Sequence, residues 1–246
     1  MSAVAGSGRL PVGFWLMTAN LHACEIAKEV GYDIVVLDLE HGTWNPESVD
    51  RAIALGKAVG LTVYARVGGA ERVPIQSALD AGADAVIVPQ IRNAEHARAA
   101  ASYAKYPSLG TRGIGHSRIN RYGGFSPEFL DAENRRTQCI VMIETQEAFD
   151  DVERIAAVPA IDGLFIGPGD LSLTRGRGLN RDTPADAADH RRIVDAARAA
   201  GKAWSMAAGH QRRRRFATEL GAAFITTTDD LSAVRAGLAA DLALSY

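Results

Sequence analysis

The chain has 246 residues, of which 47% are hydrophobic and 23% are charged, so it can bury a substantial single core. A formal charge of −2 and a pI near 6.3 argue against nucleic acid and anionic membranes as partners, and they favour small molecules. No apolar stretch approaches the roughly 18 residues that span a bilayer, and the first residues lack the pattern of a secretion signal. We therefore expect a cytoplasmic protein with no membrane partner, in which Cys24 and Cys139 are reduced core residues.

Short apolar segments typical of buried strands alternate along the chain with longer amphipathic segments typical of helices. The strands are predicted at residues 12–17, 33–39, 62–67, 85–90, 139–144, 163–167, 202–208 and 222–228. The helices are predicted at residues 21–31, 46–60, 72–82, 94–106, 146–158, 185–201, 211–221 and 231–244. Eight such units, with strands apolar on both faces, predict one α/β domain over residues 1–246, a closed (β/α)8 TIM barrel. A doubly wound open sheet is the alternative, but no G-x-G-x-x-G follows the first strand.

An insertion at about residues 106–136 interrupts this alternation after the fourth predicted helix. It is rich in Gly, Arg and polar residues, and it is too long for an ordinary connection. Loops of this length in a compact barrel are usually functional or part of an oligomer contact. The sequence leaves both possibilities open.

Polar side chains follow five of the predicted strands at the point where each strand ends. They are Asp38, Glu40, His41, Arg66, Gln90, Glu144 and Asp170. Each is weak evidence alone, because a strand-end His or Arg is often structural and an acid after Gly often caps a helix. Since reacting groups of a barrel stand at the carboxyl ends of its strands, the convergence of these residues on one mouth predicts an active site.

Glu144 and Asp170 are the most informative members of this set. Glu144 ends the apolar run CIVMIE, and Asp170 follows GLFIG after a Gly-Pro-Gly turn. Two carboxylates delivered from successive strand ends are suited to hold one hard divalent cation in a cleft. The sequence therefore predicts a metal-dependent enzyme.

The lysines argue against a Schiff-base aldolase, which needs a lysine inside the barrel near the mouth. Lys28, Lys57 and Lys105 fall on predicted helices, and Lys202 enters the seventh strand at the opposite end of the barrel. Carbanion chemistry in this barrel would therefore rely on a metal as Lewis acid.

Seven segments resemble the HpcH/HpaI family of metal-dependent pyruvate aldolases along nearly the whole chain. They are GFWL at 13–16, LDLEHG at 37–42, ARV at 65–67, LDAGADAVIVPQ at 79–90, RGIG at 112–115, IET at 143–145 and FIGPGDLS at 165–172. The resemblance implies a class II aldolase, a lyase that reversibly cleaves 4-hydroxy-2-oxoacids into pyruvate and an aldehyde through a metal-stabilised enolate. It also implies that Glu144 and Asp170 bind Mg, Mn, Co or Zn, and that backbone N–H groups near Gly169 and Asp170 hold the pyruvate carboxylate.

The same resemblance assigns further residues to the reaction. Arg66 would stabilise the enolate oxygen, and His41 would be the base, acting directly or through a bound water. A helix aspartate that matches Asp80 would pair with His41 and raise its basicity; a helix C-terminal acid without such a partner is unfavourable. Trp15 and Ala207 match positions that line the substrate pocket, although Trp15 also suits an ordinary barrel core.

Two features depart from the family pattern. Met142 stands where the family commonly has Gln in a QIE run, which puts the usual dicarboxylate substrates in doubt. Ala207 and Ala208 stand where larger aliphatic residues are common, which would widen the acceptor side of the pocket.

Other functions remain open at this stage. A related enzyme of this family could act on acyl-CoA, as citrate lyase subunits do, or make citrate, although no adenine and pantetheine site is evident. A non-catalytic barrel is a third possibility, against which the intact set of strand-end residues argues. Family precedent further implies a homo-oligomer, a hexamer built as a trimer of dimers, with C-terminal helices exchanged between subunits.

Overall fold

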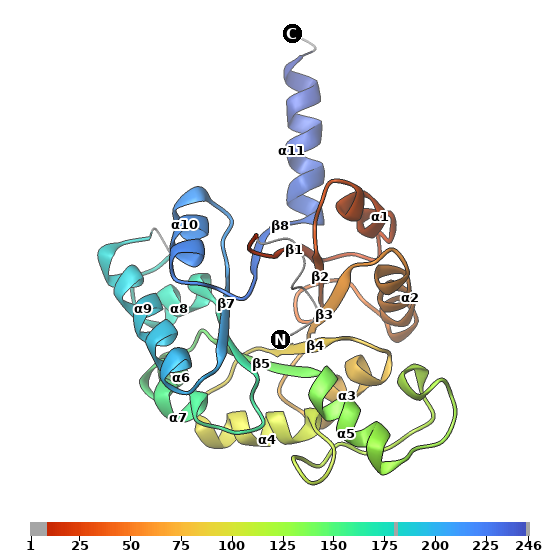
Figure 1. The fold of residues 1–246 in the computed structure, drawn as a ribbon. Coiled ribbons are helices and arrows are strands. Elements are labelled where there is room, and N and C mark those ends of the chain that lie inside the picture. The colour runs from red at the N-terminus through yellow and green to blue at the C-terminus, as the bar shows by residue number, and fades with distance from the viewer. Residues whose placement is uncertain (1–8, 180–181, 245–246) are drawn as a thin grey trace.

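The structure is a computed structural model that describes residues 9–179 and 182–244. Eight parallel strands form a closed barrel in the order of the sequence, with β8 returning to pair with β1 (Figure 1). The strands are β1 (Val12–Leu16), β2 (Ile34–Asp38), β3 (Thr62–Arg66), β4 (Ala85–Val88), β5 (Gln138–Ile143), β6 (Gly163–Ile166), β7 (Ala203–Ala207) and β8 (Ile225–Asp229). The predicted TIM barrel is therefore confirmed, and the open sheet is excluded.

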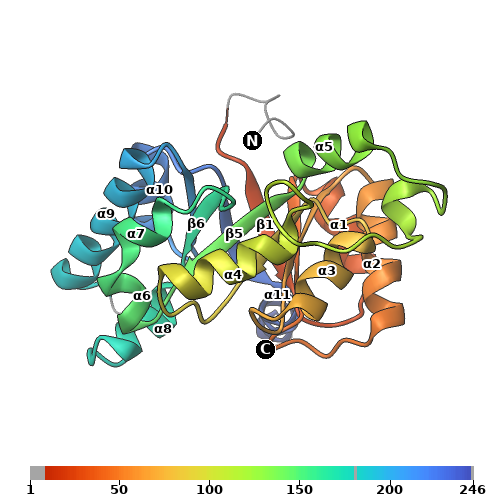
Figure 2. The ribbon, with the colours of Figure 1, turned by 90° about the horizontal axis from the view of Figure 1, so that it is seen from below.

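Helices follow the strands and surround the barrel (Figure 2). They are α1 (His22–Glu29), α2 (Pro46–Ala58), α3 (Arg72–Asp80), α4 (Ala94–Ala104), α6 (Gln146–Asp150), α7 (Val152–Ala156), α8 (Pro168–Thr174), α9 (Pro184–Ala199) and α10 (Gln211–Glu219). The single helix predicted at 146–158 is divided at Asp151. The Asp151 carboxylate accepts a hydrogen bond from Ala94 N at 2.7 Å, so it ties this break to the first turn of α4.

The insertion is partly helical rather than a simple loop. It contains a short 3-10 turn, η1 (Arg118–Asn120), and the helix α5 (Pro127–Arg136), which begins with Ser126 as N-cap and Pro127 as its first residue. Arg136 at the end of α5 pairs with Asp84, in the loop that enters β4, at 2.9 Å. The end of α5 is thus fixed at the amino-terminal end of the barrel, opposite the predicted site.

Apolar side chains fill both faces of the strands. One buried cluster lies inside the barrel, formed by Ile34, Val36, Tyr64, Ala85, Ile87, Ile140, Met142, Phe165 and Phe224. A larger cluster joins the outer face of the strands to the helices and includes Cys24 and Cys139, both free thiols. Because alternate residues of each strand enter different clusters, the sequence shows continuous apolar runs instead of alternation.

The last helix, α11 (Asp230–Ala243), projects away from the barrel (Figure 1). Its apolar side chains are largely exposed, from 53% for Val234 to 68% for Leu238. Only its first residue is buried: the Asp230 carboxylate accepts hydrogen bonds from Met17 N and Thr18 Oγ1 at the junction of β8 and β1. Within the described residues, no helix combines the length and apolar character needed to cross a membrane.

Candidate active site

The carboxyl ends of the strands surround one mouth, which lies above the apolar interior of the barrel. Trp15 at the end of β1 meets Phe165 edge to face, with ring centroids 5.8 Å apart, and Phe165 packs on Phe224 at the same separation. These rings form a dry floor beneath the mouth. Charged groups above such a floor interact more strongly than they would in water.

Asp38, the last residue of β2, organises one side of the mouth. Its side chain is 1% exposed, and its Oδ1 accepts hydrogen bonds from the backbone N–H groups of Glu40 and His41 at 3.2 and 3.1 Å. Gly42 completes this turn, because a Cβ there would lie 2.3 Å from the carbonyl oxygen of Asp38. The buried carboxylate thus fixes the loop that carries His41.

Arg66, the last residue of β3, is held on three sides. Its Nε donates to Asp38 Oδ1 at 3.0 Å, its Nη2 donates to Asp38 Oδ2, and its Nη1 lies 3.3 Å from Glu40 Oε2. Its guanidinium also stacks on the Trp15 ring, with 4.8 Å between Cζ and the ring centroid. A guanidinium has five N–H donors, so these contacts leave donors on Nη1 and Nη2 for a substrate oxygen.

Glu144 follows the last residue of β5 and lies opposite this cation. The residue is 1% exposed, and its Oε1 accepts hydrogen bonds from Gln90 N at 2.8 Å and Gln90 Nε2 at 3.2 Å. Its Oε2 lies beside Gly167, where an added Cβ would come within 2.7 Å of it. Only glycine at 167 leaves room for the carboxylate in this position.

Asp170 stands in the first turn of α8, with Gly167 as N-cap. Gly167 has no side chain to cap this helix start, and Asp170 is the acidic residue of the first turn. The backbone N–H groups of Gly169 and Asp170 belong to the first turn, where a helix supplies no internal acceptor. A Cβ at Gly169 would meet nothing within 4 Å, so this edge of the mouth is open.

Four carboxylates, those of Asp38, Glu40, Glu144 and Asp170, gather at the mouth around the guanidinium of Arg66. Burial raises the pKa of Glu144 to about 7, and repulsion from Glu40 and Asp170 adds to this effect. The hydrogen bond from Gln90 N and the charge of Arg66 oppose the rise. Burial also raises the pKa of Glu40, against the charges of Arg66 and His41. The site therefore carries more negative charge than its own cation compensates.

These residues suit a divalent cation. Glu144 and Asp170 offer hard oxygen donors, and both hydrogen bonds from Gln90 to Glu144 end on Oε1 and not on Oε2. No cluster of three or more His, Cys, Asp or Glu side chains arranged for a metal occurs within residues 9–179 and 182–244. Two carboxylates with the other positions left to water and substrate is the pattern that Mg²⁺ favours.

The lysines lie at the end of the barrel opposite the mouth. The ammonium groups of Lys28, Lys57, Lys105 and Lys202 bind acceptors in the loops that enter β3, β4, β5 and β6. This placement agrees with the expectation that no lysine forms an imine with a substrate at the mouth.

Asp80 does not join His41 within one chain. Asp80 is the last residue of α3, which runs back toward the start of β4, so it lies at the end of the barrel opposite the mouth. Its carboxylate pairs with the buried Arg112 at 2.5 Å, whereas the exposed His41 ring has its Nε2 3.7 Å from Glu40 Oε2. Within one chain the two side chains are thus apart, because a barrel helix carries its last residue away from the mouth.

The predicted lining residues divide into two groups. Trp15 and Ala207 pack against the cluster inside the barrel, at the level of the mouth. Ala208 is fully buried in the outer cluster between strands and helices, so it does not widen the pocket. This part of the prediction is wrong because neighbouring strand residues point to opposite faces.

A cleft of about 530 Å³ opens beside the mouth, between the loops that follow β3, β4 and β5. Its ionisable lining consists of Glu40, Glu71, Glu147, Arg92 and His96. Burial and the charge of Arg92 lower the pKa of His96. The cleft is thus lined by three carboxylic side chains and one guanidinium, and one of the three, Glu40, also lies 3.3 Å from Arg66 at the mouth.

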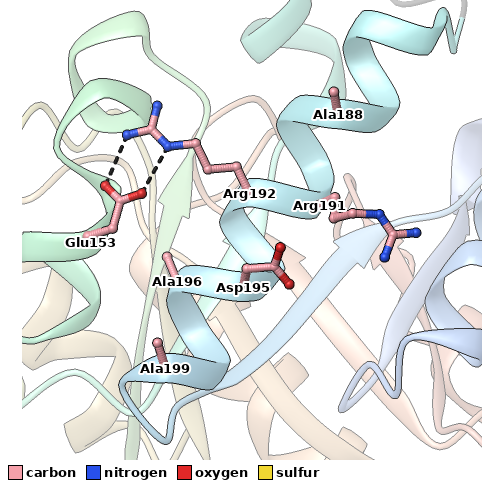
Figure 3. Close-up of a pocket in the computed structure, with 7 residues that line it drawn as sticks. All are labelled: Glu153, Ala188, Arg191, Arg192, Asp195, Ala196 and Ala199. Carbon is pink, nitrogen blue, oxygen red and sulfur yellow. Dashed lines mark hydrogen bonds and ion pairs between the residues drawn. The ribbon is translucent and has the colours of Figure 1, made fainter.

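A second depression lies on the outer surface of α9 and is remote from the mouth (Figure 3). Ala188, Ala196 and Ala199 leave it shallow, while Arg192 crosses to Glu153 with hydrogen bonds of 2.9 and 3.0 Å. Arg191 points away from Arg192 in this view. Its polar lining consists of the ion pair between Arg192 and Glu153 and of the side chains of Arg191 and Asp195.

Two functional features were missed by sequence reasoning. Asp38 is recognisable in the sequence as a strand-end acid, yet its role in holding both Arg66 and the His41 loop is visible only in three dimensions. Gly167 is recognisable only as part of a turn, although its position directly after a buried strand was a signal for a close approach. Both act by placing another residue.

Comparisons with known proteins agree with this geometry. The model of the HpcH/HpaI aldolase/citrate lyase family matches residues 11–236. A 4-hydroxy-2-oxo-heptane-1,7-dioate aldolase from Salmonella arizonae is 33% identical, and the match covers 94% of this chain and 88% of that protein. A 4-hydroxy-2-oxovalerate aldolase from Novosphingobium aromaticivorans is 39% identical over 71% of this chain, and the match spans 66% of its length.

Solved structures show the same fold. The crystal structure of an HpcH/HpaI aldolase from Desulfitobacterium hafniense superposes with a TM-score of 0.90. It is 26% identical in sequence, and the superposition covers 96% of this chain and 93% of that chain.

Proposed function

The chain belongs to the HpcH/HpaI aldolase/citrate lyase family, and we propose that it is a divalent-metal-dependent aldolase. It would reversibly cleave 4-hydroxy-2-oxoacids into pyruvate and an aldehyde; the relatives are named as aldolases of two such acids, 4-hydroxy-2-oxovalerate and 4-hydroxy-2-oxo-heptane-1,7-dioate. The observation that carries this proposal is the mouth itself, where a rigidly held Arg66 faces the carboxylates of Glu144 and Asp170. A developing oxyanion needs such a fixed cation.

Glu144 and Asp170 would hold the cation, which when bound acts as a Lewis acid and neutralises their excess charge. The N–H groups of Gly169 and Asp170 would bind the substrate carboxylate. Arg66 would donate to the keto oxygen as it becomes an enolate oxygen, and it needs no reorganisation because Asp38 and Glu40 already fix its orientation.

His41 would take the proton from the 4-hydroxyl group during cleavage and return it during synthesis. Its side chain is 59% exposed at the mouth, so it can reach a substrate that occupies the opening. Trp15 and the aromatic floor beneath it would exclude water from the side of the reacting carbon that faces the barrel.

The acceptor preference follows from charge. Met142 is buried inside the barrel and offers no hydrogen-bond donor to a substrate carboxylate. The cleft beside Gln90 carries three carboxylates against one guanidinium. We therefore propose that neutral aldehydes are better acceptors than aldehydes that carry a carboxylate.

An oligomer with exchanged C-terminal helices would explain α11. A helix with apolar residues on all sides needs a cover, and Leu231, Leu238 and Leu242 are 55%, 68% and 61% exposed in the single chain. The same assembly would be required for Asp80 to reach a His41, since the two lie at opposite ends of one barrel. We propose a hexamer, in line with the family resemblance.

The direct test is pyruvate release from a panel of 4-hydroxy-2-oxoacids, with and without EDTA. We expect release that EDTA abolishes and that added Mn²⁺ restores. Calorimetric titration should show Mn²⁺ binding that Glu144→Ala and Asp170→Ala each remove, because two anionic ligands supply most of the charge of the site. Glu153→Ala, which removes an exposed carboxylate from the outer surface, is the matched control and should bind Mn²⁺ as the wild type does. Unchanged affinity in both site variants would refute the metal site.

A further inference from the structure

Gln90 has a backbone conformation that its residue type disfavours. It follows β4, and its φ of +53° lies in the left-handed region that favours glycine. The residue is exposed, so packing does not force this conformation. Strained residues of this kind persist where surrounding contacts determine them, and they gather at functional sites.

The contacts that determine this conformation are with Glu144. In the left-handed conformation Gln90 donates from both its backbone N and its side-chain Nε2, and both bonds end on Glu144 Oε1. A carboxylate oxygen has two lone pairs, so these two donors fill the acceptor capacity of Oε1. The other oxygen, Oε2, accepts neither of these bonds and lies beside Gly167, where an added Cβ would come within 2.7 Å of it.

We propose that Gln90 is a positioning residue, which fixes Glu144 so that it binds the cation through Oε2 alone. This inference rests on the proposed metal site. The chemistry of the side chain suits this role, because an amide orients a carboxylate without neutralising it, whereas a guanidinium would compete with the cation and an acid would repel the ligand. Gln90 contacts Glu144, the proposed metal ligand, and lines the cleft, but this role needs no contact between Gln90 and the reacting atoms of the substrate.

Gln90→Met and Gln90→Gly test the role of the amide. Both remove Nε2 and keep the backbone N–H; Met keeps the length of the side chain, and Gly removes any strain of the left-handed backbone. Gln76→Met makes the same chemical change on α3, where the Gln76 side chain accepts from Gly113 N far from the mouth. The measurements are the Kd for Mn²⁺ by electron paramagnetic resonance, the melting temperature in EDTA, and kcat and KM for pyruvate formation at saturating Mn²⁺.

We expect both Gln90 variants to weaken Mn²⁺ binding by about tenfold or more, the usual effect of losing a partner that orients a ligand. We expect kcat at saturating Mn²⁺ to stay within about twofold of wild type, and Gln76→Met to change none of these values. Wild-type Mn²⁺ affinity in Gln90→Gly would overturn the inference, even if Gln90→Met bound Mn²⁺ weakly. The weak binding of the Met variant would then be due to the bulk of its side chain and not to the lost amide. A wild-type protein that fails to bind Mn²⁺ would instead refute the proposed function.

Discussion

Replacing Glu144 by Gln should stabilise the protein in the absence of metal. Burial, together with repulsion from Glu40 and Asp170, raises the pKa of Glu144 from 4.5 to about 7. The folded protein therefore holds this proton more tightly than the unfolded chain does. The stabilisation from this group is fully present below pH 4.5 and is lost as the pH rises through about 7. Gln has the same shape, carries no charge and can still accept from Gln90 N.

The size of the effect follows from the two pKa values. Each pH unit between them corresponds to about 1.4 kcal/mol, so ionising Glu144 at pH 8 costs about 3 kcal/mol. For a chain of this length about 1 kcal/mol shifts the melting temperature by roughly 2–4 °C. The Glu144→Gln protein should thus melt about 6–12 °C above wild type at pH 8, and close to it at pH 4.5.

Thermal unfolding in EDTA at a series of pH values, at one protein concentration, measures this difference. Mn²⁺ should reverse the order at pH 8, because it binds the ionised carboxylate of the wild type and has lost a ligand in the variant. Groups remote from the mouth titrate equally in both proteins, so the difference between them reports Glu144 and the carboxylates coupled to it. A difference that does not grow between pH 5 and pH 8 would refute the assigned electrostatics.

Further variants test the roles of Arg66, His41 and Asp80. Arg66→Ala should lower kcat by about 10² or more, with a parallel loss of pyruvate proton exchange, as expected when an oxyanion-stabilising donor is removed; normal exchange with only a raised KM for the aldehyde would make Arg66 an acceptor contact. Asp80→Asn should lower kcat with little change in Mn²⁺ affinity, and adding it to His41→Ala should cost nothing further if the two act as one unit across chains. Additive losses would leave Asp80 only its ion pair with Arg112.

The strands could be predicted closely because burial on both faces leaves a strong signal. The predicted strand at 33–39 contains β2 (Ile34–Asp38), and the predicted strand at 139–144 overlaps β5 (Gln138–Ile143). The insertion was harder, since the Ser126–Pro127 start of α5 lies inside a Gly- and Arg-rich segment. The break at Asp151 could not be seen, because it depends on a tertiary bond to Ala94.

The site was predictable to the extent that it follows from strand ends. Asp38, Arg66 and Glu144 each stand at or just after the last residue of a strand, so a parallel barrel brings them together. Asp80 shows a limit of this reasoning. Its sequence motif resembles that of a family, but the partner of its carboxylate depends on how one barrel packs against another, which strand ends do not reveal. Ala208 shows a second limit, since one residue along a strand changes the face.

Gln90 and Met142 illustrate what only the structure could add. The sequence predicts that both residues lie near the site. In the structure the Gln90 amide reaches Glu144, whereas the Met142 thioether lies in the barrel interior. The two sides of the mouth are thus held by different kinds of interaction. On one side Asp38 and Glu40 hold Arg66 by charge, and on the other Gln90 holds Glu144 by neutral donors. A neutral clamp does not compensate the charge of Glu144, so under the proposed function the side around Glu144 would depend on a cation and the side around Arg66 would not.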